Sequence, residues 1–331
     1  VKHVNENVGV LDMSAFGKCR ISGSGAKAFL DKMIANKLPK NKGRVILAHS
    51  LSIGGGVHSE FTIMKEKEDS FYLVSAGSAQ RLDHDWLKKQ MPTDGSVQFT
   101  DLTNSMGVLV VSGPKSRDLL QRVTTTDMSN DAFKWLTAKK IDVEYAPTIA
   151  SRVNFVGELG WELHHPIEYQ NHIFDALFAA GKEFNVKPFG IRAMDMMRLE
   201  KSYRMVGTEM SIEYSAFESG LHKFVKLDKP DFLGREGLVL SNEREANNQF
   251  VTLHVRETTD ADVIGGNPIY SGGKLVGRAT SGGYGFRVGF SIALAMVKPE
   301  KAAIGTLLEI DILGKKYVTE VIEESPFDPE N

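Results

Sequence analysis

The sequence predicts an α+β fold built from antiparallel sheets, with a β-barrel at the C-terminal end. Strand-like runs are mixed with short helical segments, and no regular βα repeat is present, which argues against a doubly wound fold. Glycine-rich turns join successive strand-like runs, as in antiparallel hairpins. Beyond residue 249 the chain consists of short strand-like runs at a spacing typical of a small barrel.

The first third of the chain contains a predicted hairpin between two predicted helices. Apolar residues recur at helical spacing over 26–35 and predict a helix there. Ser78 has a side chain suited to a helix N-cap and predicts a second helix that continues through Leu87. Strands are predicted over 45–52, 57–64 and 71–76, the first two joined by the turn Gly54-Gly55-Gly56.

The rest of the chain divides at a polar, charged stretch over 241–249. This stretch predicts two domains, residues 1–240 and residues 245–331. Before it, the pattern predicts a strand over 108–111 and helices over 115–123, 169–184 and 192–203. After it, strands are predicted over 250–255, 269–276, 288–297, 307–313 and 317–321, with hairpin turns at 271–273 and 314–316.

Composition excludes several classes of function. The 331 residues carry 40 basic and 42 acidic side chains, so neither nucleic acid nor an anionic membrane is expected as the main partner. The sequence contains no run of about 18 apolar residues, so no membrane span is predicted. The single cysteine, Cys19, excludes an internal disulfide and fits a reducing compartment. We expect a cytoplasmic location in a bacterium, or the mitochondrial matrix in a eukaryote.

The stretch 152–163, RVNFVGELGWEL, contains a candidate ligand-binding carboxylate. It is predicted to form a strand, a bend and a second strand that ends near Glu162. Glu162 stands between Trp161 and Leu163, and an acid flanked by large apolar groups loses solvation unless a donor binds it. A flat heterocycle with paired N–H donors, such as a pterin or purine, would satisfy it. The alternative is an exposed strand acid.

The glycine turn at 54–56 introduces a second candidate site. Gly55 and Gly56 allow a backbone to approach a ligand closely. The strand that follows carries Ser59 and Glu60, and Glu60 is the candidate catalytic acid. Here, too, an exposed strand acid is the alternative.

Two further patterns are rejected. Residues 23–28 have the outline of a dinucleotide fingerprint, but the next predicted strand, 45–52, contains no acid, so neither FAD nor NAD is expected. His164 and His165 are adjacent in a strand and face opposite sides, and no third ligand recurs at useful spacing. No metal site is therefore predicted.

Seven blocks of sequence, in order, together carry a family resemblance. Besides RVNFVGELGWEL, they are GVLDMSAFGK (9–18), GGGVHSEFT (54–62), VSGP (111–114), GIRAMDMMRLEKSYR (190–204), FVKLDKPDFLGRE (224–236) and GRATSGGYGFRVGFSIAL (277–294). The chain resembles the folate-binding T protein of the glycine cleavage system. It is more similar still to the C-terminal folate half of dimethylglycine and sarcosine dehydrogenases, where the first block commonly reads YVGELGWE. The resemblance implies a three-lobed fold with folate in a central channel.

The resemblance also implies roles for single residues around tetrahydrofolate. Glu162 would accept hydrogen bonds from the pterin. Phe155 would face the pterin ring where the family has Tyr, which keeps the ring and loses the hydroxyl. Glu60 would lie near N10 where the family typically has Asp, so its carboxylate reaches one methylene further.

Two more residues are assigned to the folate site less directly. Arg192 lies in the same segment as the folate-contacting arginine of the T proteins, but two residues earlier, because that position here is Met194. The alternative for Arg192 and Arg198 is a position on the helix surface, or salt bridges with Asp195 and Glu200. Residues 280–290, with Tyr284 and Arg287 exposed at a turn, would either close a wall of the channel or form an ordinary barrel loop.

By resemblance, the chain would capture an iminium or formaldehyde-level carbon as 5,10-methylenetetrahydrofolate. The small-molecule substrate would be a methylamine such as dimethylglycine or sarcosine. The partner would be a flavin dehydrogenase domain, and the present chain would be one part of a longer polypeptide. The alternatives are a stand-alone aminomethyltransferase of glycine cleavage, which needs a lipoyl carrier protein, and a non-catalytic folate-binding module.

Overall fold

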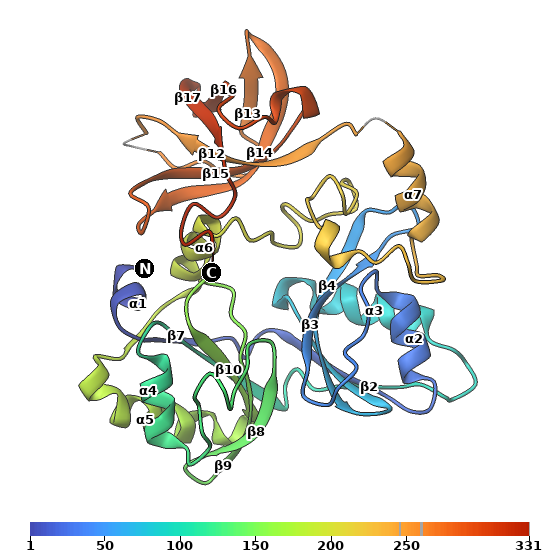
Figure 1. Ribbon diagram of the computed structural model, residues 1–331, viewed down its shortest axis with the longest axis vertical. Helices are drawn as coiled ribbons and strands as arrows, with labels where there is room; N and C mark the ends of the chain where they lie inside the picture. The colour runs from blue at the N-terminus through green and yellow to red at the C-terminus, as the bar shows by residue number, and fades with distance from the viewer. Residues whose placement is uncertain (245, 259–260, 331) are drawn as a thin grey trace.

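Three sheets, each with its own hydrophobic core, form three lobes in the computed structural model (Figure 1). The structure describes residues 1–244, 246–258 and 261–330. Two open sheets, of five and six strands, lie side by side, and a closed six-stranded barrel lies across one end of the pair. The predicted α+β fold with three lobes, antiparallel sheets and a C-terminal barrel is confirmed.

The first lobe is an antiparallel sheet covered on one face by two helices, α2 (Ala26–Met33) and α3 (Gln80–Gln90). Phe61, Ile63 and Leu73 point into the core beneath these helices. Because side chains alternate along a strand, Glu60 and Tyr72 lie on the opposite face. The strand order is β3 (Val45–Leu51), β4 (Val57–Lys67), β5 (Ser70–Ser75), β2 (Gly17–Ser22), β6 (Gln98–Asp101).

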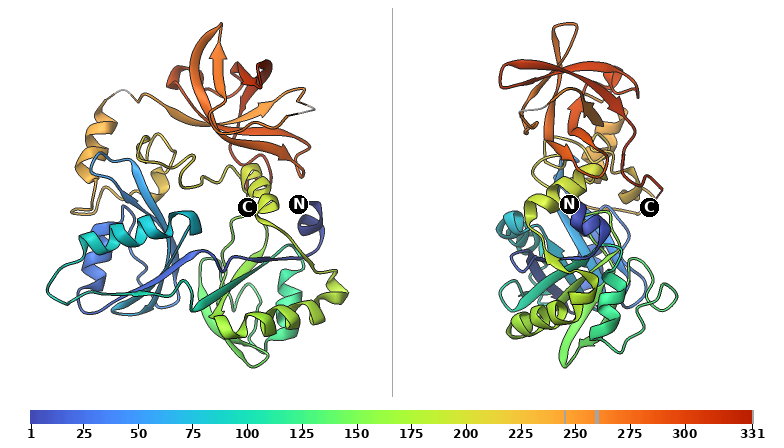
Figure 2. Two further views of the ribbon diagram at one scale, coloured as in Figure 1. Left: turned by 180° about the vertical axis from the view of Figure 1, so that it is seen from behind. Right: turned by 90° about the vertical axis from the view of Figure 1, so that its left-hand side faces the viewer.

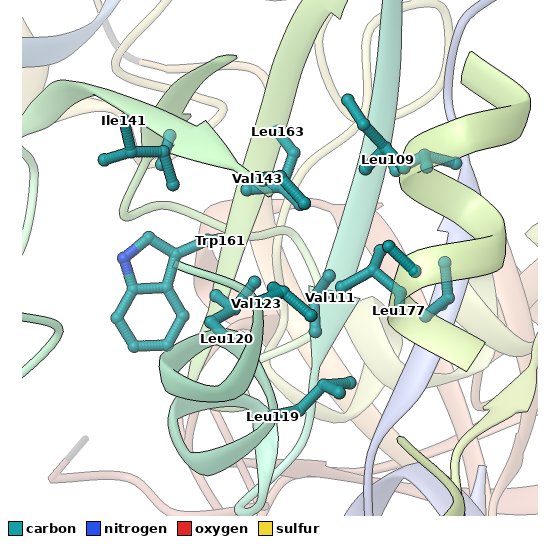
Figure 3. Close-up of a cluster of buried hydrophobic side chains, with 14 of the residues drawn as sticks. Leu109, Val111, Leu119, Leu120, Val123, Ile141, Val143, Trp161, Leu163 and Leu177 are labelled. Atoms are coloured by element: carbon teal, nitrogen blue, oxygen red, sulfur yellow. The ribbon is translucent and has the colours of Figure 1, made fainter. Parts of the chain in front are cut away.

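The second lobe is built in the same way, with α4 (Ser116–Val123) and α5 (Gln170–Ala180) over one face. Trp161 and Leu163 enter the core beside these helices (Figure 3). Alternation therefore places Glu162 on the face that the helices leave uncovered. The strand order is β11 (Lys187–Pro188), β1 (Gly9–Asp12), β7 (Met106–Ser112), β10 (Gly160–Pro166), β9 (Ala146–Ser151), β8 (Ala138–Val143). Only the pairing of β1 with β11 is parallel among these described strands.

The barrel closes in the order β12 (Gln249–Val255), β15 (Phe290–Val297), β14 (Lys274–Gly285), β13 (Pro268–Ser271), β16 (Leu307–Ile312), β17 (Lys315–Ile322). Helix α6 (Ile191–Glu200) lies between the barrel and the second lobe (Figures 1 and 2). Its Met194 and Met197 pack with Val110 of β7, whereas Leu199 packs with Ile292 of the barrel. Two other helices, α1 (Lys2–Glu6) and α7 (Arg235–Glu243), flank the lobes.

Three local predictions are wrong. Residues 152–156 form a loop instead of a strand, because the Asn154 side chain accepts hydrogen bonds from the backbone N–H groups of Val156 and Gly157, both at 3.0 Å. Ser78 forms no side-chain cap and lies in a 3-10 turn before α3. The predicted strand 269–276 is two strands, since Gly272 and Gly273 adopt positive φ between them.

The helices are short. The longest described ones, α3 and α5, have 11 residues each, about half of the roughly 20 that cross a bilayer. No helix among the described residues has the length and apolar content of a membrane span. The polar stretch 241–249 comprises the end of α7, the connection that follows it and the first residue of β12, and its residue 245 lies outside the described residues.

Candidate functional site

Glu162 lies in the middle of β10, not at its end, and β10 is buried on both faces. It is paired with Val110 of β7 on one side and with Ser151 of β9 on the other. Only 9% of the residue is exposed. Its Oε2 atom lies 3.2 Å from Nε2 of His164, whereas Oε1 has no hydrogen-bond partner among the described residues. The prediction that Glu162 is simply an exposed strand acid is therefore excluded, and one oxygen remains to accept a donor.

The surroundings of Glu162 are apolar. Its cross-strand neighbour Val110 belongs to a buried cluster with Met194 and Met197, and Phe155 packs against this cluster. The Phe155 ring is only partly buried, and its centroid lies 5.9 Å from that of Tyr203. Phe155 thus shares an apolar cluster with Val110, the cross-strand neighbour of Glu162. A carboxylate next to an aromatic ring suits a flat ligand with N–H donors.

Glu60 lies on the uncovered face of the first sheet. Its Oε1 atom is 3.1 Å from Nε2 of His49, which is paired with it across β3 and β4. The Glu60 side chain is 22% exposed, while His49 is buried. The predicted acid is therefore held by a buried imidazole and still reaches solvent.

The faces that carry the two acids meet. Tyr72, on the same face of the first sheet as Glu60, hydrogen-bonds His164, on the same face of the second sheet as Glu162. Tyr72 also packs with Ile149 of β9. Met64, the partner of Tyr72 across the strands, is four residues from Glu60 along β4, which corresponds to roughly 13 Å. A ligand that contacts both acids would therefore be longer than one ring.

The two glycines of the turn are explained by protein packing. A Cβ atom on Gly55, whose φ is +86°, would lie 2.6 Å from the backbone of Leu238 in α7. One on Gly56 would lie 2.3 Å from the carbonyl oxygen of Ile212. The close approach that requires these glycines is to the protein's own backbone. Ligand contact at Gly55 and Gly56 stays a prediction.

Arg192 and Tyr284 are not joined to the two acids by any contact among the described residues. Arg192 is exposed at the start of α6. Tyr284 is 40% exposed, and its hydroxyl donates to the carbonyl of Gly289 at 3.0 Å, within its own hairpin. Arg198, by contrast, is fully buried and bonds Asp195 at 2.8 Å and Glu209 at 2.9 Å. Arg198 therefore forms the predicted salt bridge with Asp195 but has Glu209, and not Glu200, as its second partner. Folate contact by Arg192 and Tyr284 stays a prediction.

The prediction that Arg287 is exposed is wrong. Its side chain is 1% exposed and reaches from the β14–β15 hairpin of the barrel to α6 and the second lobe. The guanidinium bonds Glu200 at 2.5 Å and Glu158 at 2.7 Å, and it also donates to the carbonyl of Val156 at 3.0 Å. Burial raises the pKa of Glu158, and Arg287 opposes that rise. Arg287 thereby fixes the loop that carries Phe155.

The sequence patterns do not identify His49, His164 and Tyr72 as parts of the site, and they place Arg287 in a candidate channel wall without predicting its burial. Glu158 and Arg287 both stand in blocks that carry the resemblance, but nothing in their spacing pairs them. His164 was considered only as a metal ligand. Among the described residues, no group of three or more potential metal ligands is present.

A buried acid beneath Glu60 makes stability depend on pH. Asp83 of α3 is 1% exposed, and its Oδ1 atom has no hydrogen-bond partner among the described residues. Burial raises the pKa of Asp83 to about 6, and the charge of Glu60 adds to the rise. The folded state therefore binds the proton more tightly than the unfolded state.

Between about pH 4 and pH 6, the folded state keeps this proton while the unfolded state loses it, so the contribution of Asp83 to stability falls as pH rises. The loss reaches at most about 3 kcal/mol and is complete above the folded pKa. We expect Asp83→Asn to remove this slope in urea midpoints measured from pH 4 to pH 8. Asp85→Asn, at an exposed position of the same helix, should retain it. An unchanged slope in Asp83→Asn would contradict the assignment.

Two protein-family domains match consecutive parts of the chain. The GCVT N-terminal domain family matches residues 1–229, and the glycine cleavage T-protein C-terminal barrel domain family matches residues 248–328. The second match coincides with the closed barrel of the structure.

Similar proteins agree with these matches. The chain is 36% identical to mitochondrial dimethylglycine dehydrogenase of Homo sapiens over 98% of its own length, but it spans only 37% of the length of that relative. It is 28% identical to an aminomethyltransferase of Thermoanaerobacter sp. (strain X514), with 97% of this chain and 87% of the relative covered.

The fold also has a solved counterpart. The crystal structure of glycine cleavage system aminomethyltransferase T from Bartonella henselae superposes with a TM-score of 0.89 at 20% identity, covering 99% of this chain and 88% of the other. At that identity the match concerns the fold alone. Because the two family matches together cover nearly all of the residues, the chain belongs to the glycine cleavage T-protein family.

Proposed function

We propose that the chain binds tetrahydrofolate and transfers a one-carbon unit to it. The observation that carries this proposal is the state of Glu162, which is nearly buried, bonded to His164 and left with no partner for Oε1 among the described residues, and whose strand neighbour Val110 belongs to the cluster that Phe155 packs against. An unpaired carboxylate oxygen next to a ring fits the N–H donors and the flat face of a pterin. The family membership and the aminomethyltransferase among the relatives support the same ligand.

The reaction requires no covalent nucleophile of the protein. Tetrahydrofolate supplies two amines, N5 and N10, that accept carbon at the oxidation level of formaldehyde. Glu162 and Phe155 would bind and orient the ring. Glu60 would accept a proton and stabilise positive charge near the reacting amine. Its bond to buried His49 limits the freedom of the longer glutamate side chain, which offsets the added methylene relative to aspartate.

We propose dimethylglycine or sarcosine as the source of the carbon, with a flavin dehydrogenase domain as partner. The 36% identity to dimethylglycine dehydrogenase and the 37% share of its length support this choice. A glycine cleavage aminomethyltransferase with a lipoyl carrier protein is the second candidate, supported by the relative of which 87% is covered. Capture of free formaldehyde without a carrier favours the first candidate. A requirement for an aminomethylated lipoyl carrier favours the second.

Titration with 5-formyltetrahydrofolate tests folate binding. We expect saturable binding by the unmodified protein and roughly tenfold or greater loss in Glu162→Gln, because the ligand donors lose a charged acceptor. Glu168→Gln, exposed in the same lobe, is the matched control and should bind normally. Absence of binding by the unmodified protein would refute the proposed function. Equal binding by all three proteins would instead refute the site at Glu162.

A further inference from the structure

A chain of three side chains crosses the boundary between the first and second lobes. The Tyr72 hydroxyl lies 3.2 Å from Nδ1 of His164, and Nε2 of His164 lies 3.2 Å from Oε2 of Glu162. The exposed fractions are 2%, 3% and 9%, in that order. The tyrosine and imidazole rings meet edge to face, with centroids 5.4 Å apart. Tyr72 comes from the first sheet, and the other two residues come from the second.

For a neutral His164 ring, the roles of donor and acceptor assign the proton positions in the chain. A carboxylate oxygen only accepts hydrogen bonds, so Nε2 of His164 carries the proton that it donates to Glu162. Among the described residues, Nδ1 of His164 is the one hydrogen-bond partner of the Tyr72 hydroxyl. A neutral imidazole with the proton on Nε2 accepts at Nδ1, so Tyr72 donates to it. Burial and the charge of Glu162 raise the pKa of Tyr72, which keeps this donor protonated.

The consequence concerns the oxygen that faces the ligand. The bond from His164 holds Oε2 of Glu162, and among the described residues Oε1 is the oxygen without a hydrogen-bond partner. Aliphatic neighbours flank His164 across the sheet, Val108 on β7 and Ile149 on β9, so its ring has little freedom to rotate. The hydrogen-bond chain from Tyr72 through His164 to Glu162 therefore makes Oε1 of Glu162 a preorganised acceptor for an N–H donor.

We propose that His164 and Tyr72 are positioning residues for the ligand: they hold Glu162 by a hydrogen-bond chain across the two lobes, so that Oε1 accepts from an N–H group of the bound heterocycle. The inference rests on the proposed function, because the heterocycle is the tetrahydrofolate of that proposal. It adds a specificity rule. A ligand with an acceptor in place of that N–H group would meet an oxygen that has no proton to give.

Two substitutions of similar polarity separate positioning from simple packing. A glutamine amide at position 164 reaches the place of Nε2 and can still donate to Glu162, whereas an asparagine amide reaches only the place of Nδ1. We expect His164→Gln to bind 5-formyltetrahydrofolate within about threefold of the unmodified protein. His164→Asn should bind roughly tenfold more weakly, since the donor to Glu162 is lost. Tyr72→Phe should weaken binding less than His164→Asn.

A spectroscopic readout accompanies the titrations. Nitrogen NMR of protein labelled at its nine histidines should show His164 as a single tautomer, protonated at Nε2, with the signal assigned by its absence in His164→Gln. In Tyr72→Phe the tautomer should persist, because Glu162 still accepts from Nε2, but the Nδ1 signal should shift because it loses its donor. Because the tautomer is measured in the unmodified protein, a folded variant is needed only for the assignment, which His164→Asn supplies equally well.

The outcomes distinguish the two proposals. Folate binding with equal losses in His164→Gln and His164→Asn, or with no loss in either, overturns the positioning role and leaves the proposed function standing. A proton on Nδ1 of His164 in the unmodified protein also overturns it. Absence of folate binding by the unmodified protein overturns the proposed function, and the ligand side of this inference with it.

Discussion

Replacing Arg287 with methionine should destabilise the protein by about 3–5 kcal/mol, the usual cost of removing one partner of a buried ion pair. Glu200 is fully buried beneath Arg287, and Glu158 is nearly so, and both would lose their cationic partner. The backbone carbonyls of Val156 and Met197 would lose a donor as well. The urea midpoint of unfolding, followed by circular dichroism, measures the loss.

A matched control comes from the barrel surface. Arg256 pairs with Glu320, but 46% of the Arg256 side chain is exposed, so Arg256→Met should cost no more than about 1 kcal/mol. A double-mutant cycle adds a second check: Glu158→Gln should cost less in the background of Arg287→Met than in the unmodified protein. If Arg287→Met and Arg256→Met shift the midpoint equally, the contact of the barrel with α6 and the second lobe does not depend on Arg287.

Arg287→Met should also weaken folate binding at temperatures where the variant remains folded. The guanidinium bonds the carbonyl of Val156, the residue next to Phe155, and so fixes the loop beside the candidate site. A loop released from this bond places the Phe155 ring less accurately, and such positioning errors reduce both affinity and rate.

Glu60→Gln should lower the rate of methylenetetrahydrofolate formation from formaldehyde by roughly 10²–10⁴-fold, the range for loss of a general acid or base. Folate affinity should change little, because Glu162 and Phe155 lie on the other lobe and keep their contacts. Rates at saturating tetrahydrofolate, compared with affinities from the titrations, separate the two effects.

The variant Glu60→Asp separates the effect of side-chain charge from that of side-chain length. The shorter side chain keeps the charge but moves the carboxylate away from His49, whose Nε2 lies 3.1 Å from Oε1 of Glu60. We expect an intermediate rate. Equal rates for the unmodified protein and Glu60→Gln would exclude a catalytic role and favour the non-catalytic folate-binding module.

Much of the fold follows from local sequence signals. The hairpin of β3 and β4 and the strands of the barrel were predicted from alternation and glycine turns, which act within about ten residues. Two of the blocks that carry the family resemblance contain Glu162 and Glu60. Local signals failed at 152–156, where apolar residues suggested a strand and the side chain of Asn154 instead folds the backbone into a turn.

What the sequence determined by itself is the fold class, the family and the two acids of the candidate site. Only the tertiary structure shows that Tyr72 contacts His164 and that Arg287 is buried against Glu158. The partners in these contacts are 92 and 129 residues apart. The physical reason is that periodicity records which face of a strand is buried, whereas the partner across a lobe boundary depends on how separate sheets pack.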